Sequence, residues 1–64
     1  MRYIYTNDQV LRASITKQPK SADTYRADEP WLLLHVTGRV DRFATYREAR
    51  DEALKSYPGS HVET

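Results

Sequence analysis

The sequence contains no cysteine, only two glycines and no long apolar run, and its opposite charges nearly cancel. A chain without cysteine has neither a disulfide scaffold nor a thiolate metal site. Two glycines do not supply the glycine-rich loops that bind phosphate groups. Ten basic against nine acidic side chains give a net charge of +1, which is far from the strongly basic character of a dedicated nucleic-acid domain.

The apolar residues are too scattered to form a membrane-spanning segment. The longest apolar run, residues 31–34 (WLLL), is much shorter than the ~18 residues that a transmembrane helix needs. Residues 1–8 (MRYIYTND) lack the apolar stretch and the cleavage site of a signal peptide. We therefore expect a soluble, cytoplasmic protein without a membrane partner.

Residues 1–16 are predicted to form a β-hairpin. Tyr, Ile and Thr, which favour strands, dominate the first half, up to the Asn-Asp turn pair at residues 7–8. Apolar and polar side chains alternate from residue 10 to 16, as in a half-buried strand. The alternative is a short helix that begins at Thr6 with a capping-box spacing.

Residues 17–30 (KQPKSADTYRADEP) are predicted to be a loop, because two prolines interrupt them and no hydrophobic period runs through them. Such a long segment without secondary structure is unusual in a compact domain, and loops of this kind are often functional. Tyr25 is the lone apolar anchor of the loop and therefore a candidate contact residue.

Residues 31–44 are predicted to form a second hairpin, with a turn at Thr37-Gly38. Two registers remain open. A two-residue loop puts one set of side chains on the same face: Leu32, Leu34, Val36, Asp41 and Phe43. A three-residue loop closed by a bulge instead groups Trp31, Leu33, His35, Asp41 and Phe43, and it places Leu32, Leu34, Val40 and Arg42 opposite them.

Residues 45–57 are predicted to form a helix. Thr45 and Glu48 have the spacing of a capping box, and Pro-Gly at residues 58–59 ends the helix. The apolar side chains form one stripe along it: Tyr46, Ala49, Ala53, Leu54 and Tyr57. Residues 58–64 are expected to be a polar tail in which only Val62 can dock.

Together these elements predict a single domain over residues 1–64, with a small core. The predicted fold class is α+β, a small antiparallel sheet (ββ-loop-ββ) with one C-terminal helix packed on a face. One helix covers one face only. Because residues 31–34 are all apolar, the other face also carries large apolar groups, and exposed patches of this kind mark contact sites. We expect the uncovered face to be a dimer interface or a partner site, with Arg42 or His35 at its rim.

No set of residues with catalytic or metal-binding chemistry is recognisable. His35 and His61 have no carboxylate at ligand spacing, and none of the four serines lies in a nucleophile motif. The sequence therefore predicts no enzyme activity, no metal and no cofactor.

Arginine and aromatic side chains are the remaining candidates for function. Four arginines fall within residues 39–50: Arg39, Arg42, Arg47 and Arg50. They predict either a patch for an anionic partner or a solvated surface neutralised by ion pairs. Tyr, Trp and Arg are also enriched at the energetic centres of protein interfaces. The candidate partner-binding residues are Trp31, Leu33, His35, Arg39, Arg42, Arg47, Arg50 and Tyr25.

Residues 31–59 combine a hairpin with a helix, and residues 43–54 carry the pattern Phe-x-Thr-x-x-Glu-Ala-x-x-x-Ala-Leu. This unit resembles that of many short phage and prophage accessory proteins, and it is similar to the sheet–helix half of phage integrase arm-binding domains. The resemblance implies a non-enzymatic, protein-binding inhibitor of the anti-CRISPR kind, which occupies a surface of a larger host nucleic-acid-handling or defence complex. The alternative is a small DNA- or RNA-binding domain that uses its arginine-bearing hairpin and helix.

Overall fold

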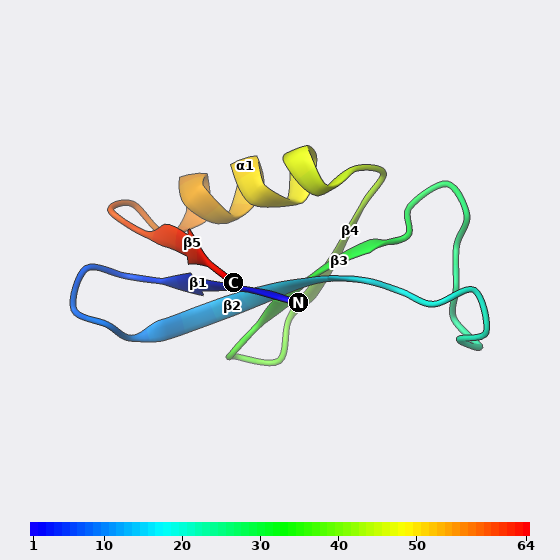
Figure 1. Ribbon diagram of the computed structural model, residues 1–64, viewed down its shortest axis with the longest axis horizontal. Helices are drawn as coiled ribbons and strands as arrows, with labels where there is room; N and C mark the ends of the chain where they lie inside the picture. The colour runs from blue at the N-terminus through cyan, green and yellow to red at the C-terminus, as the bar shows by residue number, and fades with distance from the viewer.

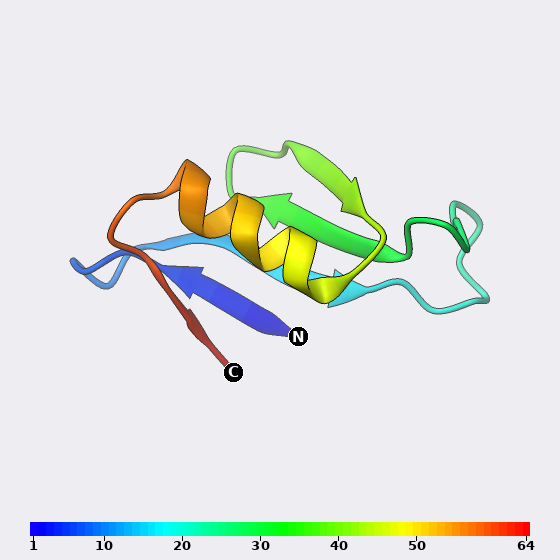
Figure 2. The same ribbon diagram turned by 90° about the horizontal axis from the view of Figure 1, so that it is seen from above.

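Five antiparallel strands and one helix make up the structure, a computed structural model that describes residues 1–64 (Figures 1 and 2). The elements are β1 (Arg2–Tyr5), β2 (Leu11–Lys17), β3 (Trp31–His35), β4 (Val40–Phe43), α1 (Tyr46–Ser56) and β5 (His61–Glu63). The strands lie in the order β4-β3-β2-β1-β5, and α1 packs on one face of the sheet. The predicted α+β class is therefore confirmed. The helix is neither long nor apolar enough to cross a membrane.

The first hairpin joins β1 to β2 through a tight turn, so the helical alternative for this segment is wrong. The Thr6 N–H donates to the carbonyl oxygen of Val10 (N···O 3.1 Å), and the Gln9 N–H donates to that of Thr6 (2.8 Å). Ile4 pairs with Ala13, and both side chains are buried.

The second hairpin has a three-residue loop, which decides between the two predicted registers. The His35 N–H donates to the carbonyl oxygen of Arg39 (N···O 2.9 Å), and the Gly38 N–H donates to that of His35 (2.9 Å). Gly38 has a φ of 97°, a conformation that favours glycine. Trp31 consequently pairs with Phe43, in the register expected for the three-residue loop.

The helix begins where the sequence predicts, because the Thr45 hydroxyl accepts a hydrogen bond from the Glu48 N–H (3.2 Å). Ala49 and Ala53 are fully buried, and their small side chains let α1 approach the sheet closely. The core cluster consists of Ile4, Ala13, Ile15, Leu33, Ala49 and Ala53. Partly buried side chains pack around it: Trp31, Phe43, Tyr46, Tyr57 and Val62.

The end of the chain differs from the prediction, since residues 61–63 form β5 rather than a polar tail. The strand pairs with β1, with Val62 opposite Ile4, and Val62 packs against the core. A three-residue strand with one apolar side chain has no alternation long enough to recognise. The free edge of β1 supplies its pairing partner, so the helix is not the last element of the fold.

The loop predicted for residues 17–30 begins one residue later, because Lys17 ends β2. Residues 18–30 contain no helix or strand and extend past one end of the sheet (Figure 1). The Gln18 N–H closes the base of the loop by donating to the carbonyl oxygen of Pro30 (2.8 Å). Within the loop, Arg26 forms ion pairs with Glu29 (3.3 Å) and Asp28 (3.6 Å). The loop therefore has its own contacts and leaves most of the second face of the sheet uncovered.

Candidate binding face

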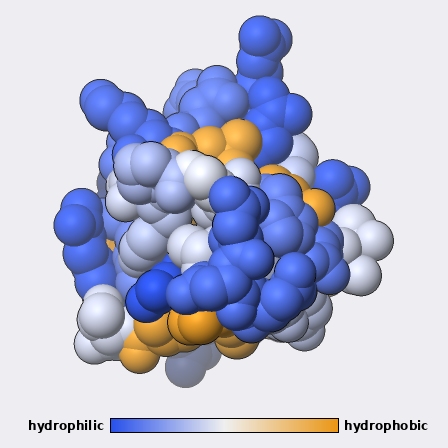
Figure 3. Space-filling model, turned by 90° about the vertical axis from the view of Figure 1, so that its left-hand side faces the viewer, coloured by the Kyte–Doolittle hydropathy of each residue, from blue (hydrophilic) through white to orange (hydrophobic).

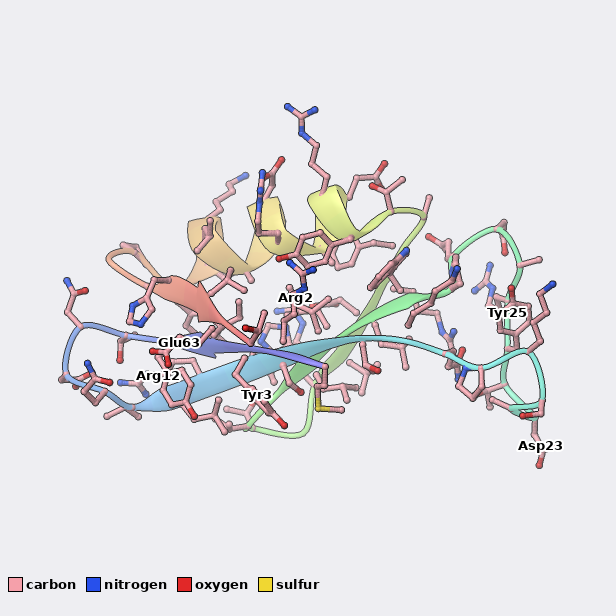
Figure 4. All side chains as sticks on the ribbon, viewed as in Figure 1. Arg2, Tyr3, Arg12, Asp23, Tyr25 and Glu63 are labelled. Carbon is pink, nitrogen blue, oxygen red and sulfur yellow. The ribbon has the colours of Figure 1, made fainter.

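The face of the sheet turned away from α1, which we call the open face, is formed by alternate residues of the five strands. Successive side chains of a strand point to opposite faces, so the neighbours of the buried core residues lie on it. Figure 4 shows Arg2 on the helix side of β1 and Tyr3 on the other side. One row across the open face consists of Val40, Leu34, Ser14, Tyr3 and Glu63. A second row consists of Arg42, Leu32 and Thr16.

The most exposed apolar side chains all lie on or beside the open face, and none belongs to α1. They are Met1, Val10, Leu11, Val36 and Val40. Val40, on the edge strand, is 52% exposed, and Leu34 beside it is half-buried. Leu11 lies on the open face, although it is two residues from Ala13, because the register of β1 and β2 shifts after Ile4 and pairs Leu11 with Tyr5. We call Leu11, Leu34, Val36 and Val40 the aliphatic corner. Figure 3 shows apolar atoms along the lower edge of this end of the molecule, and a second group in its upper part, on the side of α1.

A bridge of polar side chains covers Leu32. The Arg42 Nη1 donates to the Gln18 Oε1 (3.0 Å), and the Gln18 Nε2 donates to the Thr24 hydroxyl (2.6 Å). This bridge crosses β3 on the face where Leu32 lies between Thr16 and Arg42. Leu32 is only 9% exposed, so Leu34 alone of the two open-face leucines of β3 remains partly exposed.

The other half of the open face is aromatic and polar. The rings of Tyr5 and His61 stack at 6.4 Å between centroids. The His61 Nε2 lies 2.6 Å from the Glu63 Oε2, and Glu63 pairs with Tyr3. The small side chains of Ser14 and Thr16 on β2 separate this half from the aliphatic corner.

The four predicted arginines do not form one surface. Asp41 lies on the helix side, so Arg42 lies on the open face, while Arg47 and Arg50 belong to α1 on the opposite side. Two of the four also have acidic partners. The Arg39 Nε lies 3.2 Å from the Asp41 carboxylate, and the Arg50 Nη2 lies 3.3 Å from that of Asp51.

Three other predicted contact residues lie under the helix. Leu33 is fully buried and His35 is 9% exposed, so the prediction that they contact a partner is wrong. The three-residue loop sets the register that turns both side chains toward α1. Trp31 shares that face and is half-buried, with its ring 5.6 Å from that of Tyr46. Tyr25 lies in the protruding loop, apart from the open face (Figure 4).

His35 holds a buried polar network that the sequence did not predict. Its Nε2 lies 2.9 Å from the Asp41 Oδ2, and its Nδ1 lies 2.5 Å from the Tyr57 hydroxyl. Because an ionised carboxylate only accepts hydrogen bonds, the His35 ring donates through Nε2 to Asp41, and its Nδ1 shares a hydrogen bond with the Tyr57 hydroxyl. The hydrogen bond from His35 lowers the pKa of Asp41, with a smaller contribution from Arg39, against the opposing effect of burial.

The sequence pattern identified the residues of this network, but in two separate elements. The three-residue loop groups His35 with Asp41, and the helix stripe ends at Tyr57. The prediction lacked the packing of the helix end over β3, which brings together residues that are 22 positions apart. Long-range packing, and not local pattern, makes this network.

The candidate face has no pocket, and no group of three or more His, Cys, Asp or Glu side chains is placed to hold a metal ion. Its features are therefore those of a surface: an aliphatic corner, an aromatic half, and Arg42 between β4 and the loop. No protein-family model matches the chain, and comparison with curated proteins and with solved structures likewise gives no match.

Proposed function

We propose that the chain is a non-enzymatic binding module that contacts a larger protein through the open face of its sheet. The observation that carries the proposal is the placement of the exposed aliphatic side chains, which gather on or beside this face. The outer surface of α1 instead presents charged residues such as Arg47, Asp51 and Lys55. Contiguous exposed apolar side chains with a polar rim are typical of protein contact sites.

The chemistry of the open face fits the usual division of a protein interface. Aliphatic side chains at one corner exclude water, while Tyr3, Tyr5 and Arg42 are of the types that contribute most to binding energy. The hydrogen bond to Gln18 holds Arg42 in place, which lowers the entropy lost when a partner binds it.

The resemblance to small phage accessory proteins suggests which class of host protein the partner belongs to. Proteins of that kind act by occupying a surface of a host complex that handles nucleic acid or carries out defence. We propose that this chain inhibits such a complex by the same means. The four arginines lie on two sides of the sheet, which favours a protein partner over a phosphate backbone.

Affinity capture from host cells tests the proposal. The tagged chain is compared with a Leu34→Ser/Val40→Ser variant and with an Arg47→Ser/Lys55→Ser control on the outer surface of α1. We expect the control to capture the same host protein as the unmodified chain. We expect the open-face variant to lose it while remaining folded under the capture conditions, as checked by circular dichroism. Equal capture by the open-face variant would overturn the proposal.

Nuclease digestion of the captured complex distinguishes binding to a protein from binding to DNA or RNA. Capture through a protein contact survives nuclease digestion and weakens less with rising salt than a phosphate contact does, because only phosphate contacts release condensed counterions. Loss of the captured protein after digestion would favour the DNA- or RNA-binding alternative instead.

A further inference from the structure

The open face is too small to form a full-sized interface alone. With strands about 4.8 Å apart and about 3.3 Å of rise per residue, it measures roughly 24 Å by 15 Å, or about 360 Å². Each partner in a standard interface contributes about 800 Å². A stable contact therefore extends beyond the face, and the nearest continuation from the aliphatic corner is the outer edge of β4.

The backbone of β4 offers hydrogen-bonding groups along this edge. The carbonyl of Arg39 accepts from the His35 N–H on β3, and Asp41 and Phe43 pair with β3 in the same phase. Bonding groups alternate in direction along an antiparallel strand, so the N–H and C=O groups of Val40 and Arg42 point outward. No strand of the sheet covers them, because β4 is the outermost strand (Figure 2).

Positive charge surrounds these backbone groups. The Arg39 side chain is 69% exposed, and Arg42 keeps further N–H donors besides the one bonded to Gln18. The neighbouring acidic group, Asp41, is turned inward to His35 and Arg39. The opposite edge is different, since β5 has only three residues and carries Glu63.

We propose that β4 binds an extended, acidic segment of the partner as a sixth strand of the sheet. The segment bonds to the outward groups of Val40 and Arg42, and its acidic side chains face Arg39 and Arg42. An apolar side chain between them contacts Val40 and Leu34. This inference rests on the proposed function, because it names the part of the partner that meets the aliphatic corner.

A second copy of this chain is a poorer occupant of the edge. When β4 pairs antiparallel with β4 of another copy so that Val40 lies opposite Arg42, Asp41 lies opposite the same residue of that copy, and the two Arg42 side chains share one face. Like charges in neighbouring strands repel each other, and positively charged edges are a known defence against self-association. Charge complementarity therefore selects an acidic partner.

Nuclear magnetic resonance titration of the isotope-labelled chain tests the proposal. The probe, which we call the Glu-Val peptide, has about eight residues with Glu-Thr-Val-Glu at its centre, so that its side chains face Arg42, Val40 and Arg39 in turn. The matched control, the Lys-Val peptide, has Lys in place of both Glu residues. We expect the Glu-Val peptide to shift the amide signals of β4 and to slow hydrogen exchange at the Arg42 N–H. Equal binding of the Lys-Val peptide, or shifts centred on β5, would overturn it.

Two variants at one position identify the backbone contact. Val40→Pro removes the outward N–H without removing a bond to β3, and it should weaken the Glu-Val peptide roughly fivefold. Val40→Thr keeps the N–H and the branched shape, so it should bind nearly as the unmodified chain does. If Val40→Pro disturbs the fold, chemically synthesised chain with N-methylvaline at position 40 makes the same deletion. Unchanged affinity in a folded N–H deletion contradicts the strand pairing but leaves the open-face proposal to the capture experiment.

Discussion

The covered face and the open face of the sheet are built from the same strands but differ in how deeply their apolar side chains are buried. On the covered face, Ile4, Ile15 and Leu33 are fully buried beneath α1. On the open face, Leu34 is half-buried and Val40 mostly exposed, although Leu33 and Leu34 are neighbours in the chain. Because one residue of register separates the two faces, the turn that sets the register also decides which side chains stabilise the fold.

This comparison teaches that apolar character alone does not identify the core. The sequence WLLL offers four large side chains, but α1 covers one set of alternating positions only. The remaining side chains contribute less to folding and are available for contact. The predictions below separate the two contributions.

The largest difference is expected between Leu33→Ala and Leu34→Ala. Truncating the fully buried Leu33 should cost about 2–5 kcal/mol, the range for buried leucines. Truncating the half-buried Leu34 should cost about 1 kcal/mol. Urea unfolding measures both values, and Ile15→Val, at about 0.5–1.5 kcal/mol, provides a milder core variant if Leu33→Ala does not fold. Equal costs for the two leucines would remove the distinction between the faces.

Tyr57→Phe should show that the network around His35 belongs to the covered face. The variant leaves the His35 Nδ1 without its hydrogen-bond partner in a buried position, which should cost about 1–3 kcal/mol. Tyr3→Phe on the open face is the matched control and should change stability by less than about 0.5 kcal/mol. Thermal melts of the two variants with the same midpoint would contradict the buried network.

Thr45→Ala should destabilise the helix that covers the core. The hydroxyl accepts the Glu48 N–H, and loss of such a cap costs about 1 kcal/mol. Thr37→Ala, in the exposed turn, is the control for loss of a threonine hydroxyl. A Thr45→Ala midpoint equal to that of Thr37→Ala would show that the cap is not important for the helix.

The smallest effect on stability is expected for Asp41→Asn, and this effect should disappear in acid. Its pKa lies below the ordinary value of 3.8, mainly because His35 donates a hydrogen bond to it. The ionised carboxylate therefore contributes stability that is present above this value and is lost as the pH falls through the lowered pKa. Asp41→Asn should lower the free energy of unfolding at neutral pH and converge toward the unmodified chain below pH 3.8. A deficit that is independent of pH, as expected for Thr45→Ala, would contradict this role.

Local pattern predicted the parts of the fold that depend on neighbouring residues. The Thr45 cap and the alternation in β2 require only short segments, and Gly38 marks the turn of the second hairpin. The choice between its two registers depended on the loop conformation, which the residues alone left open. Strand β5 escaped prediction because its pairing is supplied by the edge of β1, distant in the chain.

The candidate site was predicted in outline but not in its residues. The uncovered apolar face follows from residues 31–34 and a single helix, as the sequence indicated. The burial of Leu32 does not, because it depends on Gln18 reaching Arg42 across β3. Leu33 and His35 were assigned to a partner because the direction in which α1 packs was not known before the structure.

The most direct test of the central claim is methyl cross-saturation from an unlabelled, captured partner to the methyl-labelled chain. Methyl groups report the face on which a side chain lies, which backbone amides cannot do. We predict the largest signal losses at Leu34, Val40 and Leu11 on the open face. Losses concentrated instead at Leu54 and Val62, on the helix side, would contradict the claim that the open face binds the partner.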